Sequence, residues 1–190
     1  AVPGFALLAW LHTRNSQPNG RITLDRGDVL LAIFAGVLCY YLGALANFYA
    51  LTIIDASIER PLLFAYPIFV VLINSAITGK LPSLRVTVAL LMTSIGVALV
   101  TGALSSTLSS TEWAGMAWVT FCSLSIAIYF LISGELTPRL GSGLFTLVAM
   151  TAAAVGFSGH YQWFFGWQNI VLSQTAWLTI VGLVVFSTVL

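Results

Sequence analysis

The sequence predicts an all-α polytopic membrane protein, built as a bundle of transmembrane helices. Of its 190 residues, 59% are hydrophobic and only 7% are charged, whereas soluble domains carry about 25% charged residues. The apolar residues form long runs, several of them near the roughly 20 residues that a helix needs to cross a bilayer. The basic residues also gather on one side of the membrane when the helices are counted.

Seven apolar segments lie between the charges and the Gly/Pro clusters. They cover about 1–12, 29–54, 57–78, 84–101, 113–133 and 144–157, and the seventh begins near residue 176. The first has only the length of a helix tail, and the seventh is shorter than a full span. We therefore expect this chain to be part of a longer protein.

The basic residues predict the orientation of the helices. Six of the seven fall in loops that are counted to the same side, and only Arg60 falls on the other. These six are Arg14, Arg21, Arg26, Lys80, Arg85 and Arg139. Lysine and arginine accumulate in cytoplasmic loops of membrane proteins. We expect these loops to be cytoplasmic, in a plasma membrane or the inner membrane of a bacterium.

Composition also excludes several classes of protein. The net charge is +1 and the basic residues form no run, so nucleic acid is not an expected partner. Cys39 and Cys122 lie inside apolar stretches and do not suggest a disulfide scaffold. His12 and His160 have no metal-ligand spacing, so neither a metal nor another cofactor is expected. The lipid bilayer and a small-molecule solute remain as partners.

A weak internal repeat indicates two inverted halves. Residues 36–40 (Gly-Val-Leu-Cys-Tyr) resemble residues 182–186 (Gly-Leu-Val-Val-Phe). By the loop count, the helices that carry these stretches cross the membrane in opposite directions. Inverted repeats of this kind are common in transporters. The spacing predicts about ten spans in the intact protein, five in each half.

The first half resembles the EamA-type transporters of the drug/metabolite transporter superfamily. The resemblance is clear over about residues 25–102 and faint over 113–190. It rests on Ala50–Ser57, Pro61, Tyr66–Val71, Gly79–Ser83, Gly96 and Gly102. Lys80 departs from the pattern, because the family usually has a glutamate there, which puts that group's gating role in doubt. The resemblance implies ten helices in two inverted repeats, and export or exchange of small metabolites through a central cavity.

This resemblance and the repeat together predict the domain organisation. Residues 1–102 would form a first EamA-like repeat that lacks its N-terminal helix. Residues 103–112, which are rich in serine, would form an extracytoplasmic linker. Residues 113–190 would be the truncated start of the second, inverted repeat.

Polar and aromatic residues at helical spacing predict a solute-binding site. Gly36, Tyr40, Gly43 and Asn47 are spaced to share one helix face. Tyr40 and Asn47 would line the transport cavity, unless this face serves only packing and an interhelical hydrogen bond. The full set of predicted substrate-binding residues is Tyr40, Asn47, Leu63, Tyr66, Pro67, Asn74, Ser125 and Tyr129.

Pro67 predicts a kink in the helix over 57–78. Proline has no N–H, so the carbonyl of Leu63 would lose its helical hydrogen bond. Freed backbone at this depth is tolerated where it faces protein or a wet cavity. Leu63, Tyr66 and Pro67 would then form a binding zone, or proline would merely bend the helix for packing. Asn74 follows Pro67 on the same stripe, as an interhelical contact or a ligand contact.

Glu59 is the one plausible proton-coupling carboxylate in the chain. No charged residue lies near the middle of any predicted span, although such residues usually mark ion or proton pathways. Glu59 and Arg60 are therefore predicted to take part in coupling or in a gate. The alternative is an exposed pair at a helix start, where the helix dipole favours the glutamate.

We predict a secondary transporter that moves a small organic metabolite, amino-acid-like or drug-like, by alternating access, with export as the expected direction. A non-transporting membrane scaffold or receptor is the first alternative. Gly156–Gly159 also matches the Gly-x-Ser-Gly pattern of rhomboid-type intramembrane proteases. A serine nucleophile needs a base within hydrogen-bond reach. His160 is too close to Ser158 in sequence and His12 belongs to the opposite membrane side, so we expect no enzyme.

Overall fold

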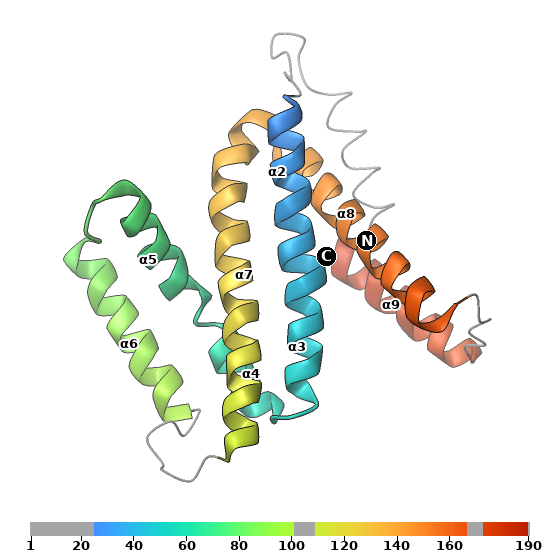
Figure 1. Cartoon of the computed structure of the whole chain (residues 1–190), viewed down its shortest axis with the longest axis horizontal. Helices are drawn as coiled ribbons and strands as arrows, with labels where there is room; N and C mark the ends of the chain where they lie inside the picture. The colour runs from blue at the N-terminus through green and yellow to red at the C-terminus, as the bar shows by residue number, and fades with distance from the viewer. Residues whose placement is uncertain (1–24, 101–108, 167–172, 190) are drawn as a thin grey trace. The chain divides into compact units, whose positions relative to one another are not determined.

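The computed structural model describes residues 25–100, 109–166 and 173–189, and these residues are helical apart from short connections (Figure 1). No strand occurs in these ranges. The elements are α2 (Arg26–Gly36), the π-helix η1 (Val37–Gly43), α3 (Ala44–Leu51), α4 (Ala56–Leu63), α5 (Tyr66–Thr78), α6 (Leu84–Val100), α7 (Ser110–Leu140), α8 (Ser142–Phe165) and α9 (Gln174–Val189).

Four helical stretches in the described ranges are long and apolar enough to cross a membrane. They are Arg26–Leu51, Ala56–Thr78, Ser110–Leu140 and Ser142–Phe164, while the apolar stretch Leu84–Leu99 is shorter. A helix satisfies its own backbone hydrogen bonds, as the bilayer interior requires. The predicted all-α polytopic membrane fold is therefore confirmed. The predicted segment at 1–12 and most of the predicted linker lie outside the described residues.

Local sequence signals explain where two of these helices begin and end. Ser109 and Glu112 form a capping box at the start of α7: the Ser109 amide and hydroxyl donate to Glu112 Oε2 at 2.7 and 2.8 Å. Together they satisfy backbone donors that a helix start leaves free. α5 ends at Gly79, whose φ of 66° is left-handed and whose amide donates to the Ser75 carbonyl.

The prediction of a loop around Arg139 is wrong, because this residue lies in a helix. α7 continues through Pro138 and Arg139 to Leu140, and α8 begins at Ser142. Gly141 alone joins the two helices, with a φ of 80° that favours glycine. The charge at residue 139 had suggested a loop, but an exposed arginine in the last turn of a helix is stabilised by the helix dipole.

Contacts divide the chain into two compact units, which we describe separately. The α2–α8 unit comprises residues 1–37 and 135–190. In its described part, α2 packs on α8 through small residues. A Cβ atom on Gly36 would overlap the carbonyl oxygen of Ala149, so the two backbones approach as closely as glycine permits. We call this contact the small-residue interface; its buried residues are Ala32, Ala35, Gly36, Phe145, Ala149 and Ala153.

Arg139 ties the ends of two helices of this unit together. Its Nη1 lies 3.5 Å from Asp28 Oδ1, and its Nη2 lies 3.4 Å from Glu135 Oε1. The start of α2 and the end of α7 are thus at the same end of the unit, as the predicted topology requires. Which side of the membrane that end faces stays a prediction.

The α3–α7 unit comprises residues 38–134. η1 and α3 pack along α7, and Ala50, Ile54 and Val119 form a buried cluster against which side chains of α4 pack. α5 and α6 lie side by side as a hairpin (Figure 1). The unit therefore brings the predicted span over residues 29–54 against α7, the helix that follows the serine-rich stretch.

The π-helical turns of η1 were not predicted from the sequence. They place Gly43 near the Leu38 carbonyl and near α7: a Cβ there would lie 3.5 Å from Ser125 Cβ and 3.7 Å from Cys122 Sγ. Because a π-turn holds more residues than an α-turn, the predicted single face is divided. Gly36 contacts α8, whereas Gly43 contacts α7.

The helical stretch that contains Pro67 is interrupted just before this residue, where a kink was predicted. α4 ends at Leu63, Phe64 and Ala65 form a turn, and α5 begins at Tyr66 with Pro67 in its first turn. Proline is well tolerated there, because the first amides of a helix have no helical partner. The three residues of the predicted stripe, Arg60, Pro67 and Asn74, are all exposed.

Candidate functional site

A cavity of about 320 Å³ opens within the α3–α7 unit. η1, α3, the last residue of α4 and α7 contribute its walls. Four of the predicted substrate-binding residues, Tyr40, Asn47, Leu63 and Tyr129, line it together. The complete lining is Cys39, Tyr40, Ala44, Asn47, Leu63, Cys122, Ile126, Tyr129 and Phe130.

Aromatic rings form one side of this cavity. The Tyr40 hydroxyl donates to the Tyr129 hydroxyl at 3.1 Å, and the two rings meet edge to face with centroids 5.1 Å apart. Tyr129 makes a second edge-to-face contact with Phe130 at 6.0 Å. Tyr66 stacks on Phe130 at 5.2 Å and 13°. Tyr66 therefore supports the aromatic side without lining the cavity itself.

Asn47 contributes an unsatisfied polar atom to the cavity. Its Oδ1 is buried and accepts no hydrogen bond from the described residues. Buried polar groups are nearly always hydrogen-bonded, and an unpaired one is costly. The interhelical hydrogen bond predicted as the alternative role of Asn47 is not made by this oxygen. A donor from a solute or a water molecule would satisfy it.

The Leu63 carbonyl cannot accept a helical hydrogen bond from Pro67, but it accepts one from a side chain of α7. The Ser123 hydroxyl of α7 donates to this oxygen at 3.1 Å, and Ser123 is fully buried. The Leu63 carbonyl thus bonds outside its own helix, as the lack of an N–H on Pro67 suggests. Its donor, Ser123, was not predicted from the sequence. A serine on a helix gives no signal of its own, because most serines there bond back to their own backbone.

Glu59 lies fully buried near the cavity, on the α4 face that also carries Leu63 one turn later. Its Oε2 is 3.2 Å from Arg60 Nε, yet neither carboxylate oxygen accepts a hydrogen bond from the described residues. The Arg60 side chain is 64% exposed. The alternative prediction of an exposed pair is thus wrong for Glu59 and correct for Arg60.

Besides Tyr66, three predicted substrate-binding residues do not line the cavity. Ser125 is buried near Gly43, and its hydroxyl bonds back to the Phe121 carbonyl at 2.9 Å. Pro67 and Asn74 have exposed side chains on α5. All three lie in the same unit as the cavity without contributing to its walls.

Four lining residues on α7 follow a spacing that sequence reasoning could have used. Cys122, Ile126, Tyr129 and Phe130 recur at i, i+4, i+7 and i+8, the pattern of one helix face. Only Tyr129 was predicted, because the other three are apolar and indistinguishable from packing residues. Cys39 was missed for the same reason.

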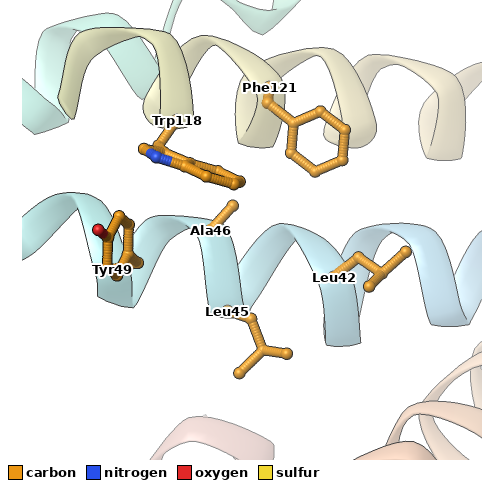
Figure 2. Close-up of a pocket in the computed structure, with 6 residues that line it drawn as sticks. All are labelled: Leu42, Leu45, Ala46, Tyr49, Trp118 and Phe121. Carbon is orange, nitrogen blue, oxygen red and sulfur yellow. The ribbon is translucent and has the colours of Figure 1, made fainter. Parts of the chain in front are cut away.

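A second pocket, of about 460 Å³, lies along α3 and α7 and is shown in Figure 2. Trp118 and Phe121 extend from α7, and the Trp118 ring meets that of Tyr49 edge to face at 5.5 Å. The lining is Leu42, Leu45, Ala46, Tyr49, Trp118 and Phe121. A pocket with almost no polar atoms cannot orient a polar solute, so this groove is a weaker candidate.

The largest of the three pockets belongs to the α2–α8 unit, with a volume of about 630 Å³. Thr151 contributes its only hydroxyl, and the rest of the lining is apolar or glycine. It is lined by Ile33, Val37, Leu147, Val148, Thr151, Ala152, Val155 and Gly156. Volume alone does not make a site, and the cavity around Asn47 has the polar groups that specificity needs.

The serine of the protease-like pattern is engaged with its own helix. Ser158 Oγ donates to the Ala154 carbonyl at 2.8 Å on α8. His160 stacks on Phe164 of the same helix, with centroids 4.7 Å apart. Two residues apart on a regular helix, Ser158 and His160 point to different faces. Within the described residues, no group of three or more His, Cys, Asp or Glu side chains could hold a metal ion.

Comparison with known proteins finds relatives that are named as transporters. The chain is 31% identical over 153 residues to an uncharacterized transporter of Bacillus subtilis, YcbK, covering 80% of this chain and 48% of that protein. It is 25% identical over 129 residues to an uncharacterized transporter of Archaeoglobus fulgidus, covering 68% of this chain and 45% of that protein. The chain spans about half the length of these curated relatives.

No solved structure matches the chain. Residues 1–102, more than half of it, match the EamA-like transporter family, in agreement with the resemblance carried by residues 50–71 and 79–102. The family indicates a transporter rather than an enzyme. With its apolar helices of membrane length, the chain is an integral membrane protein and belongs to the EamA-like transporter family.

Proposed function

We propose that this chain is part of a secondary transporter that moves a small organic metabolite by alternating access, and that the 320 Å³ cavity binds the solute. Family membership and two relatives named as transporters support transport as the activity. The observation that carries the choice of cavity is the buried, unpaired Asn47 Oδ1 beside the Tyr40–Tyr129 pair.

The cost of burying polar groups favours this choice. An amide oxygen without a donor is expensive in a protein interior, and no bilayer lipid tail can satisfy it. A site that a polar solute enters gives this oxygen its missing donor during the transport cycle. The volume lies at the lower end of the range for ligand pockets, which favours a small metabolite, amino-acid-like or drug-like.

Irregular backbone beside the cavity supports a change of conformation. η1 carries Cys39 and Tyr40 in π-helical turns, and π-turns are frequent at functional sites. On another wall, α4 ends at Leu63 before the break at Phe64 and Ala65. Half-helices that end at mid-membrane are typical of transporter binding sites. We propose that these two places move when the cavity changes sides.

Orientation, direction and coupling complete the proposal. The Arg-rich loops would lie in the cytoplasm of a plasma or bacterial inner membrane, and transport would run outward as the family resemblance implies. Glu59 would couple transport to a proton, because a buried carboxylate in a membrane is costly unless it is paired or protonated. Arg60 would hold the carboxylate in one state of the cycle.

The reactivity of Cys39 tests this proposal against a non-transporting scaffold. In the full-length Cys122→Ala variant, Cys39 is the cavity thiol, and Cys39→Ala in the same background is the control. We expect a small, membrane-impermeant methanethiosulfonate reagent to modify Cys39 from either side of the membrane, in vesicles of opposite orientation. A scaffold needs no water at this depth, so a thiol that is unreactive from both sides contradicts the proposal.

A further inference from the structure

Among the described residues, those that line the cavity present hydrogen-bond acceptors and aromatic faces but no cation. No Lys, Arg or His is among its lining residues. Asn47 presents a carbonyl oxygen without a donor, and the Tyr40 and Tyr129 hydroxyls add further oxygens. An anionic solute would find no positive partner here. A solute that brings its own donors fits this lining better.

The aromatic side of the cavity also favours positive charge. Tyr40, Tyr129 and Phe130 are grouped by edge-to-face contacts, and Tyr66 stacks behind Phe130. An ammonium group near the face of an aromatic ring is attracted by the ring quadrupole, and more strongly so where water is excluded. The same rings would also bury the apolar part of an organic cation.

Glu59 places a buried carboxyl group beside this lining. Glu59 lies one helical turn before Leu63, and Leu63 lines the cavity. Glu59 has no exposed surface, whereas its neighbour Arg60 is mostly exposed. Solvent or headgroups therefore screen the guanidinium more than the carboxylate. Of this ion pair, only the carboxylate lies in the protein interior.

We propose that the cavity is selective for small organic monocations, whose ammonium group is held between Asn47 Oδ1, the tyrosine pair and the charge of Glu59. This inference rests on the proposed function, which makes the same cavity the solute site. It adds the chemical class of the solute. A neutral solute of equal shape would fill the cavity but would gain no electrostatic attraction to the Glu59 carboxylate.

Three probes of similar size separate charge from shape: 2-phenylethylammonium, 2-phenylethanol and phenylacetate. We expect calorimetric titration of the full-length protein to show the ammonium probe binding at least tenfold more tightly than the alcohol, with no binding of the acetate. Glu59→Gln should remove this preference and leave the affinity for the alcohol unchanged. Glu135→Gln, a carboxylate change at an exposed position of α7, should change neither affinity.

Equal binding of the ammonium probe and the alcohol would overturn the inference, as would a preference that survives Glu59→Gln. The same inference fails if none of the three probes binds. Because Glu59→Gln could also impair folding, the wild-type preference decides the matter by itself.

Cys39 separates failure of this inference from failure of the proposed function. In the Cys122→Ala background, we expect a cationic methanethiosulfonate reagent to modify Cys39 faster than an anionic one, relative to their rates with a free thiol in solution. Modification by both reagents at the solution ratio would leave a water-accessible cavity but overturn its selectivity. Modification by neither would overturn the proposed function, and this inference with it.

Discussion

The two units solve the problem of packing helices in a membrane in opposite ways. At the small-residue interface, Gly36 lets α2 approach the backbone of α8 at Ala149. In the α3–α7 unit, aromatic rings line one side of a cavity formed by η1, α3, α4 and α7. All buried polar residues of the described ranges, Glu59, Ser123 and Ser125, belong to the α3–α7 unit. The pocket of the α2–α8 unit is larger but almost wholly apolar, so the polar groups that a solute site needs belong to the α3–α7 unit.

The largest effect should come from Gly36→Ala. The new Cβ would meet backbone atoms of α8, which cannot rotate away as a side chain can. We expect a loss of stability of about 3 kcal/mol, the upper end for overpacking. Thermal unfolding of the purified protein in detergent measures this loss. Gly159→Ala on α8, where a Cβ meets nothing within 4 Å, is the matched control. Equal stability of the two variants would refute the close approach.

Asn47→Leu should separate function from stability in the other unit. Leucine cannot bind a polar solute, but it removes an unpaired buried oxygen. We expect solute flux in proteoliposomes to fall by about tenfold or more, while stability stays equal or rises by roughly 1 kcal/mol. Phe48→Leu, at an exposed position of the same helix, should leave flux unchanged. If Asn47→Leu lowers the stability as well as the flux, Asn47 is a packing residue rather than a solute contact.

Tyr40→Phe tests the hydroxyl pair at the cavity and should have a moderate effect. The ring contact with Tyr129 remains, and only the 3.1 Å hydrogen bond is lost. We expect solute affinity to weaken by roughly threefold to tenfold, since a single hydrogen bond contributes about 0.5–1.5 kcal/mol. Tyr49→Phe, which lines the apolar pocket of Figure 2, should not change the affinity. Equal effects of both variants would show that the tyrosine pair has no special role.

Ser123→Ala should have the smallest effect, and a second substitution should reverse it. Without the serine hydroxyl, the Leu63 carbonyl has no donor, because Pro67 has no amide N–H. We expect a loss of about 1 kcal/mol in thermal unfolding. In the double variant with Pro67→Ala, the new amide can donate to this carbonyl and should recover most of the loss. Additive losses in the double variant would mean that Pro67 and Ser123 do not serve the same carbonyl.

How far the sequence predicts this molecule depends on how regular each helix is. Composition and apolar runs predict the membrane helices, and helical spacing predicts that Tyr40 and Asn47 share a face. Both succeed because hydrophobic burial and the helix period are local properties. Spacing fails across η1, where wider turns assign Gly36 and Gly43 to different partners, and across the break before Tyr66. Those irregularities depend on tertiary contacts.

Glu59 shows the limit of prediction for the site. Its position at a helix start is typical of an exposed carboxylate favoured by the helix dipole. Its burial results from α4 packing against α7 near Cys122, two elements that are distant in sequence. Ser123 was missed for the same reason, since its partner Leu63 lies 60 residues away in the chain. Residues whose role depends on distant parts of the chain can be recognised only once the fold is known.

The single residue between α7 and α8 has a consequence for biogenesis. Two long apolar helices joined only by Gly141 leave no loop in which positive charge could retain one end in the cytoplasm. The translocon would therefore receive α7 and α8 with no polar loop between them. Arg139 would act as its topological signal from within the helix, already paired with Glu135 one turn earlier. A longer polar loop at Gly141 would allow the two helices to insert independently.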